Sequence, residues 1–145
     1  MKIQFFENVK GLDSRAINGG VYLIELLQYN CEDSIRLYIG ESGYMVKRCG
    51  EHLYELFKDA SYFGLLPNDL KRDDLILRFS VLEKIEKKRE GKRDIFYEDI
   101  ERKYISAIKP LTQKKDDDDQ ICRDERVDKI QHEIKKLAFN KYLDI

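Results

Sequence analysis

Three stretches of the chain carry the hydrophobic pattern of β-strands. Residues 21–29 are mostly apolar and predict a buried strand, whereas residues 35–42 and 75–85 alternate apolar with polar positions. The polar segment 30–34, NCEDS, separates the first two stretches and predicts a short turn. Two strands joined by so short a loop pair antiparallel, so the pattern predicts a hairpin followed later by a third strand.

Two further stretches show the three- and four-residue spacing of helices. The first covers about residues 44–60, and a loop containing glycine and proline is predicted after it at residues 61–74. The second begins at Asp94, a favourable N-cap residue, and ends near Ile108 because Pro110 disfavours helical backbone before it. The apolar stripe of the first helix is predicted to consist of Met45, Cys49, Leu53, Leu56, Phe57 and Ala60.

The C-terminal segment has its own helical stripe, at Val127, Ile130, Ile134 and Leu137. Acidic residues precede this stripe and lysines follow it, which is the charge order that a helix dipole favours. The aspartate run at residues 116–119 could be a metal-binding cluster, but such a run is more often a solvated linker or a helix start. Because an exposed apolar stripe is unfavourable, we expect this helix to dock on the domain or to dimerise, with a protein partner as the third alternative.

The order of elements is therefore strand, strand, helix, strand, helix and helix. It predicts the α+β class, with a small three-stranded sheet flanked by helices and an extra C-terminal helix. We expect one domain over residues 1–113 and a helical appendage over residues 114–145.

Charge and composition narrow the classes of function. The 27 Lys and Arg residues nearly cancel the 28 Asp and Glu residues, so a nucleic-acid surface must be a local patch rather than a global field. No apolar run reaches the roughly 20 residues that a membrane-spanning helix needs, and the N-terminus has no signal-peptide core. We therefore expect a cytoplasmic protein without membrane contact.

The cysteines and histidines argue against two kinds of metal or disulfide site. Cys31, Cys49 and Cys122 are odd in number and contain no CxxC pair, which favours a reducing compartment over a disulfide framework or a zinc site. His52 and His132 are the two histidines of the chain, so a centre with several histidine ligands is excluded.

Two tyrosines in the predicted hairpin each have a glycine two positions away. Residues two apart on a strand share a face, so Gly20 is expected to leave space beside Tyr22 and Gly40 beside Tyr38. Another backbone or a ligand could then approach both hydroxyls. The alternative is that the tyrosines are ordinary strand residues and that the glycines mark strand ends.

Arg48 and His52 are four residues apart and share one face of the first predicted helix. They flank its apolar stripe, so we expect them at the boundary between helix and sheet. The same row continues to Glu55, and a surface row of ion pairs is an equally good interpretation.

Glu101 is the carboxylate with the least ordinary surroundings. On the second predicted helix, Tyr97, Tyr104 and Ile108 surround it at spacings of four, three and seven residues. A carboxylate on a largely aromatic face needs a hydroxyl, a cation or a metal as a partner.

These residues form an ordered set: GVY at 20–22, YIG at 38–40, Arg48, His52, and Glu101 in ERKYISAIKP. In order and spacing the set resembles the GIY-YIG nuclease family, over about residues 18–113. The resemblance implies a three-stranded antiparallel sheet flanked by helices. It also implies hydrolysis of phosphodiester bonds in DNA with a single divalent metal, usually magnesium, for which manganese can substitute. Members serve as homing, restriction, repair and mobile-element nucleases.

The resemblance also implies a role for each matching side chain. Tyr22 corresponds to the tyrosine that contacts the attacking water, and Tyr38 to the one that orients water or phosphate. Arg48 corresponds to the arginine that holds the scissile phosphate, and His52 to a histidine that assists proton transfer in several members. Glu101 corresponds to the sole acidic metal ligand, with Gly20 and Gly40 as support of the site.

Two positions depart from the family pattern. Many members carry asparagine three residues after the proline, where this chain has Gln113, which keeps the amide but adds a methylene. The residue after YIG is often lysine or small and polar, and here it is Glu41. An inward Glu41 would add a metal ligand or repel phosphate, but strand alternation from Gly40 favours an outward orientation.

DNA contacts are predicted in the turn at residues 84–93, which has six basic and two acidic residues. An exposed lysine-rich turn is also common on ordinary protein surfaces. The candidate DNA-binding residues are Lys87, Lys88, Arg89, Lys92 and Arg93.

The sequence thus predicts a magnesium-dependent DNA endonuclease. The alternative is the same domain with weakened chemistry, because of Glu41 and Gln113, that binds nucleic acid or protein or serves as a subunit of a larger complex. A homodimer or a protein partner would be engaged through the C-terminal helix.

Overall fold

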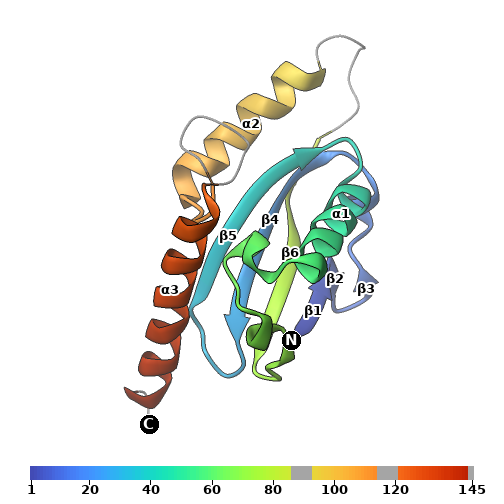
Figure 1. Cartoon of the computed structure of the whole chain (residues 1–145). Coiled ribbons are helices and arrows are strands. Elements are labelled where there is room, and N and C mark those ends of the chain that lie inside the picture. Colours follow the sequence, from blue (N-terminus) through green and yellow to red (C-terminus); the bar gives the residue numbers. More distant parts are fainter. Residues whose placement is uncertain (86–92, 114–120, 144–145) are drawn as a thin grey trace.

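The computed structural model describes residues 1–85, 93–113 and 121–143, with side chains described for residues 1–85, 97–113 and 121–138 (Figure 1). The strands are β1 (Lys2–Phe5), β2 (Glu7–Asn8), β3 (Gly11–Leu12), β4 (Gly20–Gln28), β5 (Ser34–Ser42) and β6 (Leu75–Lys84). The α-helices are α1 (Met45–Lys58), α2 (Arg93–Ile108) and α3 (Arg123–Leu143), and short 3-10 helices are η1 (Ser14–Ile17), η2 (Ala60–Phe63) and η3 (Pro67–Lys71).

The main sheet has four strands in the order β1-β6-β4-β5. Strand β4 pairs antiparallel with β5, as the short loop between them predicts, and also with β6, and the α+β class is confirmed. The prediction of a purely antiparallel three-stranded sheet is wrong, because β1 pairs parallel with β6 and makes the sheet mixed. The additional strand is only four residues long, and its partner lies more than 70 positions away along the chain.

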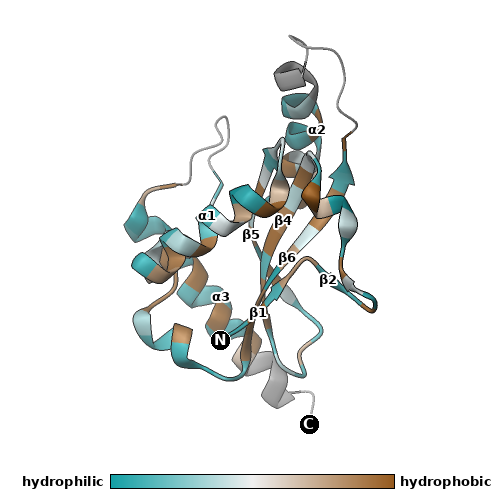
Figure 2. Ribbon diagram, turned by 90° about the vertical axis from the view of Figure 1, so that its right-hand side faces the viewer, coloured by the Kyte–Doolittle hydropathy of each residue, from teal (hydrophilic) through white to brown (hydrophobic). Residues whose placement is uncertain are grey.

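The two faces of the sheet carry two separate cores. On β4, Tyr22 and Ile24 belong to the larger core, which α1 covers, while Val21 and Leu23 belong to a smaller core under α2. In Figure 2 the central strands are largely hydrophobic (brown), and hydrophilic residues (teal) are frequent on the outer faces of the helices. Because side chains alternate along β4, one strand supplies both cores.

A β-bulge in β5 sets which residues face α1. Ile24 lies opposite Tyr38, but the next residue of β4 lies opposite Arg36, so Leu37 is the extra residue. Tyr38 and Leu37 both belong to the larger core despite being adjacent in the sequence. Without the bulge, strict alternation would send one of them to the other face.

Helix α1 buries a different stripe from the predicted one. Its buried residues are Met45, Cys49, His52 and Leu56, whereas Leu53 is only partly buried and Phe57 is 61% exposed. The prediction for Phe57 is therefore wrong. Successive steps of four, three and four residues from Met45 lead to Cys49, His52 and Leu56. Helical geometry therefore buries the imidazole of His52, while the more apolar Leu53 and Phe57 turn away from the core.

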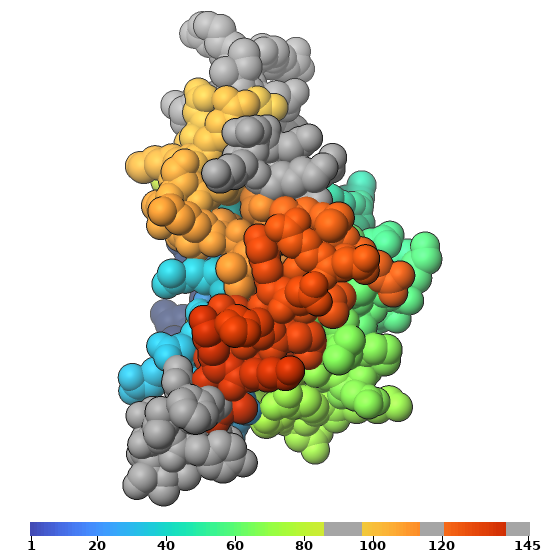
Figure 3. All heavy atoms as spheres, turned by 60° about the vertical axis from the view of Figure 1, so that its left-hand side comes forward, coloured from blue at the N-terminus to red at the C-terminus, as the bar shows by residue number. Residues whose placement is uncertain are grey.

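Helix α3 docks on its own chain. Ile130, Ile134 and Leu137 are buried in the larger core, which confirms docking as one of the predicted alternatives. The Nε group of Arg126 donates to the carbonyl of Ser61 at 3.1 Å, which ties the helix to η2. Figure 3 shows α3 (orange to red) lying against the green residues that follow α1.

The outer edge of β5 is covered by the segment that follows α2. The backbone N–H groups of Leu111 and Thr112 donate to the carbonyls of Arg36 and Leu37, each at 3.0 Å. An uncovered strand edge would present unpaired donors and acceptors, so this segment completes the sheet on the β5 side. Among the described residues, no helix is both long enough and apolar enough to cross a membrane.

We expect Ile130→Ala to lower the free energy of unfolding by about 2–5 kcal/mol, because it leaves a cavity where α3 meets the sheet. The matched change Ile17→Ala removes the same atoms from a side chain that is 53% exposed, and should stay within about 0.5 kcal/mol of the unmodified chain. Urea unfolding followed by circular dichroism measures both. Equal losses in the two variants would contradict the docked position of α3.

Candidate active site

A chain of three side chains links the sheet to α1 and η2. The hydroxyl of Tyr22 on β4 lies 2.8 Å from Nε2 of His52 on α1. Nδ1 of the same imidazole lies 2.8 Å from the hydroxyl of Tyr62 in η2. Tyr22 and His52 are each 1% exposed, whereas Tyr62 is half-buried. Both ring nitrogens of a buried histidine are thereby satisfied by tyrosine hydroxyls.

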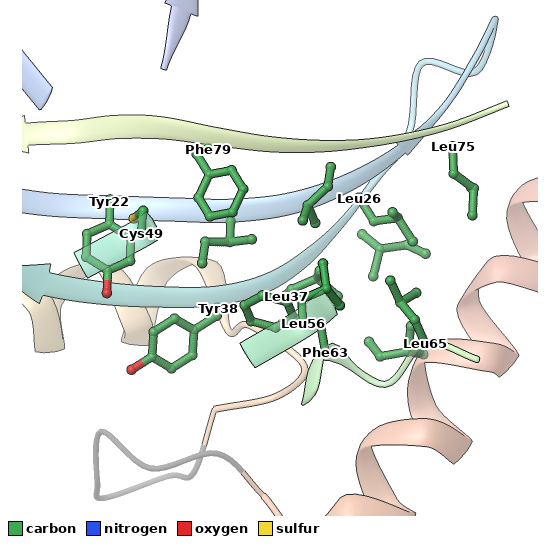
Figure 4. Close-up of a cluster of buried hydrophobic side chains, with 14 of the residues drawn as sticks. Tyr22, Leu26, Leu37, Tyr38, Cys49, Leu56, Phe63, Leu65, Leu75 and Phe79 are labelled. Atoms are coloured by element: carbon green, nitrogen blue, oxygen red, sulfur yellow. The ribbon is translucent and has the colours of Figure 1, made fainter. Parts of the chain in front are cut away.

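Tyr38 completes an aromatic cluster around the imidazole. Its ring centroid lies 5.2 Å from that of His52 and 6.5 Å from that of Tyr22. Figure 4 shows Tyr22 and Tyr38 at the same end of the larger core, with Cys49 beside Tyr22. Tyr38 faces the same core as Tyr22 because it pairs with Ile24 across the hairpin, and Ile24 lies two residues after Tyr22 on β4.

The space beside Gly20 and Gly40 is occupied by other atoms of the protein. A Cβ atom at Gly40 would collide with the hydroxyl and ring of Tyr22, and one at Gly20 would collide with the carbonyl of Glu83. Of the two occupants that the sequence left open, another backbone is therefore the one found at Gly20, and at Gly40 the space is taken by the Tyr22 side chain rather than by a ligand. Gly40 instead lets the Tyr22 hydroxyl pass over the β5 backbone on its way to His52.

Arg48 lies one turn before His52 on α1 and is the most exposed of the predicted catalytic residues. Its Nη1 group donates to Glu51 at 2.9 Å, and the two side chains are 44% and 52% exposed. The guanidinium is close enough to lower the pKa values of Tyr22 and Tyr62, although burial raises both pKa values more strongly.

Glu101 projects from α2 and is 3% exposed. Its carboxylate contributes to a raised pKa of Tyr22, whose largest cause is burial. Tyr38 and Arg48 also act on the Tyr22 hydroxyl. Of the other four predicted catalytic residues, His52 and Tyr38 therefore lie beside Tyr22, and the charges of Arg48 and Glu101 act on its hydroxyl. Their catalytic roles stay predictions.

Burial controls the charge of His52. Removal from water, together with a smaller contribution from the positive charge of Arg48, lowers the pKa of the imidazole to about 3. The ring is therefore neutral at physiological pH. A neutral imidazole has one N–H donor and one nitrogen acceptor. The ring therefore donates a hydrogen bond to one tyrosine hydroxyl and accepts one from the other.

The donor set near Tyr22 is poor in metal ligands. Within the described residues, no group of three or more His, Cys, Asp or Glu side chains could hold a metal ion. One carboxylate together with tyrosine hydroxyls still fits magnesium, which keeps several waters and takes substrate phosphates as ligands. Glu101 is the residue that would hold it. The aspartate run at residues 116–119 lies outside the described residues.

The two departures from the family pattern have separate positions. Glu41 pairs with Val21 across the hairpin, on the face opposite to Tyr22 and Gly40, as strand alternation predicts. The side-chain oxygen of Gln113 accepts the Ile39 N–H at 2.9 Å, so the longer amide still supports the YIG strand.

The predicted DNA-binding residues are not placed by the structure. Lys87, Lys88, Arg89 and Lys92 lie outside the described residues, as does the side chain of Arg93 at the start of α2. Sequence reasoning also missed Tyr62, which lies in the segment predicted as a loop. Hydrophobic periodicity does not predict which side chains of an irregular segment are buried. The adjacent aromatic residues Tyr62 and Phe63, shortly after the helix, were the sequence feature that could have indicated a contact here.

Comparison of the chain with protein-family models, with curated proteins and with solved structures found no match.

Gly40→Ala should lower the free energy of unfolding by about 1–3 kcal/mol, because the new methyl group overlaps the Tyr22 ring and hydroxyl. Gly50→Ala is the matched control, since a Cβ there meets no atom within 4 Å on the exposed face of α1. It should raise stability by roughly 0.5–1 kcal/mol through helix propensity. Loss of stability in both variants, measured by urea unfolding, would argue against the tight Tyr22 contact.

Stability should also fall as the solution is acidified. The unfolded chain takes up a proton at His52 near the ordinary pKa of 6.5, whereas the folded chain does so only near 3. The unfolded state therefore binds more protons between these values, and the His52 contribution is roughly 1.5 kcal/mol from pH 6.5 to about pH 5. His52→Gln should remove this part of the slope, and His132→Gln, on the exposed face of α3, should keep it. Equal slopes in both variants would show that His52 is not buried as described.

Proposed function

We propose that this chain is a divalent-metal-dependent DNA endonuclease with a GIY-YIG type of active site. One observation carries the proposal. Of the five residues selected by their resemblance to a family pattern, His52 and Tyr38 lie beside the Tyr22 hydroxyl, and the charges of Arg48 and Glu101 act on it, although 79 positions separate Tyr22 from Glu101.

Arg48 supplies the contact to the scissile phosphate. Its ion pair with Glu51 joins two side chains about half exposed to water, and such pairs contribute little to stability. A phosphate oxygen can therefore replace Glu51 at small cost. The planar guanidinium suits a phosphate and offsets the charge that develops on its oxygens during hydrolysis.

Tyr22 and His52 handle the proton of the attacking water. Burial keeps the pKa of Tyr22 far above neutral pH, so its resting form is the neutral phenol. A neutral phenol accepts a proton at its oxygen only while its own hydroxyl proton leaves. His52 Nε2, at 2.8 Å, is placed to take that proton, and the low pKa of the ring keeps a nitrogen lone pair available.

Tyr38 and Glu101 flank this pair. Tyr38 lies beside the imidazole and can orient water or phosphate through its hydroxyl. Glu101 would hold magnesium, which when bound supplies charge stabilisation to the phosphate oxygens and the leaving group. A cation bound there would also offset the repulsion between this carboxylate and an approaching phosphate, which would tie activity to the metal.

Nicking of supercoiled plasmid in the presence of magnesium tests the proposal. We expect Glu101→Ala to abolish nicking, Tyr22→Phe to slow it at least about 100-fold, and Arg48→Ala to slow it about 100- to 1,000-fold. Glu98→Ala is the control for α2, because this exposed residue lies one turn before Glu101. Chelation of the metal should stop nicking by the unmodified chain.

Intact plasmid and intact branched DNA across magnesium, manganese and other divalent metals would overturn the enzyme proposal. Retained DNA binding in that case, measured by fluorescence anisotropy, would favour a binding module of the same fold.

A further inference from the structure

We infer that Tyr62 is a positioning residue: its hydroxyl accepts the Nδ1–H of His52 and thereby fixes the tautomer in which Nε2 accepts the Tyr22 hydroxyl. The role of this tautomer in hydrolysis rests on the proposed function. The tautomer itself is a property of the folded chain.

The direction of the hydrogen bonds follows from counting buried protons. The Tyr22 hydroxyl is buried, and within the described part of the chain its hydrogen-bond partner is Nε2 of His52. If Nε2 carried the ring proton, two donors would face one another or the Tyr22 proton would have no acceptor. A buried hydroxyl proton without an acceptor is costly, so Nε2 must be the acceptor.

The other end of the chain accommodates the opposite arrangement. With Nε2 unprotonated, Nδ1 carries the proton of the neutral ring and donates to the Tyr62 oxygen at 2.8 Å. Tyr62 is half-buried, so its own hydroxyl proton can reach water. Every donor among Tyr22, His52 and Tyr62 then has an acceptor. The orientation depends on both tyrosines: without the Tyr62 oxygen, each tautomer would leave one buried donor unpaired, either the Nδ1–H or the Tyr22 hydroxyl, and the preference for the Nδ1–H form would be lost.

The local structure holds the Tyr62 ring in place for this contact. Its ring packs edge-on against Phe63 with centroids 4.8 Å apart, and Phe63 is itself fully buried beside His52. The preceding residue, Ser61, hydrogen-bonds to Asp59 and accepts from Arg126 of α3. Packing and backbone contacts on both sides of Tyr62 therefore fix where its hydroxyl lies.

The same chain gives the reaction an exit for one proton. When the Tyr22 oxygen takes a proton from water, the Tyr22 hydroxyl proton passes to Nε2 and the Nδ1 proton passes to the Tyr62 oxygen. The Tyr62 hydroxyl proton then leaves to solvent. One proton enters and one leaves, and each of the three side chains remains neutral. The transfer leaves Nε2 protonated, and one proton that returns from solvent along the same path in reverse, through Tyr62 and His52 to the Tyr22 oxygen and on to the leaving group, restores the starting tautomer. No positive charge has to form on the buried imidazole, which is the form that its surroundings disfavour.

Nitrogen-15 NMR of the uniformly labelled chain at neutral pH tests the tautomer without reference to any activity. We expect His52 Nδ1 to show a protonated, pyrrole-type signal and Nε2 an unprotonated, pyridine-type signal. His132→Gln assigns the two rings, since the chain has two histidines. In Tyr62→Phe, which keeps the ring packing, the proton should move at least partly to Nε2. A protonated Nε2 in the unmodified chain, or an unchanged pattern in Tyr62→Phe, would overturn the inference.

Steady-state nicking kinetics give the second readout. Tyr62→Phe should lower kcat about tenfold, the rate equivalent of one lost hydrogen bond, and leave KM unchanged because Tyr62 acts through His52. Tyr29→Phe is the matched control, since Tyr29 follows the far end of β4 and is 62% exposed. A change in KM alone, or equal effects of the two variants, would contradict the positioning role. Failure of the unmodified chain to nick would overturn the proposed function and leave the NMR test standing.

Discussion

The hydrogen bond between Tyr22 and His52 is the constraint on which the rest of the site depends. It forces a polar ring into the middle of the apolar face of α1, between Cys49 and Leu56, and it forces residue 40 to be glycine. A buried imidazole is tolerated only when both nitrogens are paired, and this requirement recruits Tyr62 from the segment after the helix. Sheet, helix and η2 are thus fixed to one another by two hydrogen bonds that belong to the candidate site itself.

Hydrophobic periodicity predicts most of the fold because most of its contacts are local or sit on long, regular elements. The hairpin, helices α1 and α2 and the position of strand β6 follow from alternation and helical spacing. Strand β1 does not, since four residues are too few for a periodic signal and its pairing with β6 is non-local. The burial of His52 instead of Phe57 could not be read from hydropathy, because the helical angle decided it and the compensating tyrosine hydroxyls come from other segments.

The candidate site divides in the same way. The five candidate residues were selected because their spacing resembles a known pattern, and the structure puts His52 and Tyr38 beside Tyr22, with the charges of Arg48 and Glu101 acting on its hydroxyl. Tyr62 has no fixed spacing in that pattern, and a residue in an irregular segment reveals its role only through its contacts. The purpose of Gly40 was also misjudged from sequence: strand alternation placed it on the face of Tyr38, but only the register of β4 against β5 shows that Tyr22 fills the space above it.

The attachment of α3 has a consequence that reaches beyond its own packing. The helix binds η2 through Arg126 and the carbonyl of Ser61, one residue before Tyr62. Release of α3 would therefore loosen the segment that orients the imidazole, so the docking of α3 and the ordering of Tyr62 are energetically coupled. Because such coupling is reciprocal, a molecule that holds the imidazole and its tyrosines in place must also tighten α3 against the body of the protein. The stability with which the C-terminal helix is docked therefore reports whether the site is ordered.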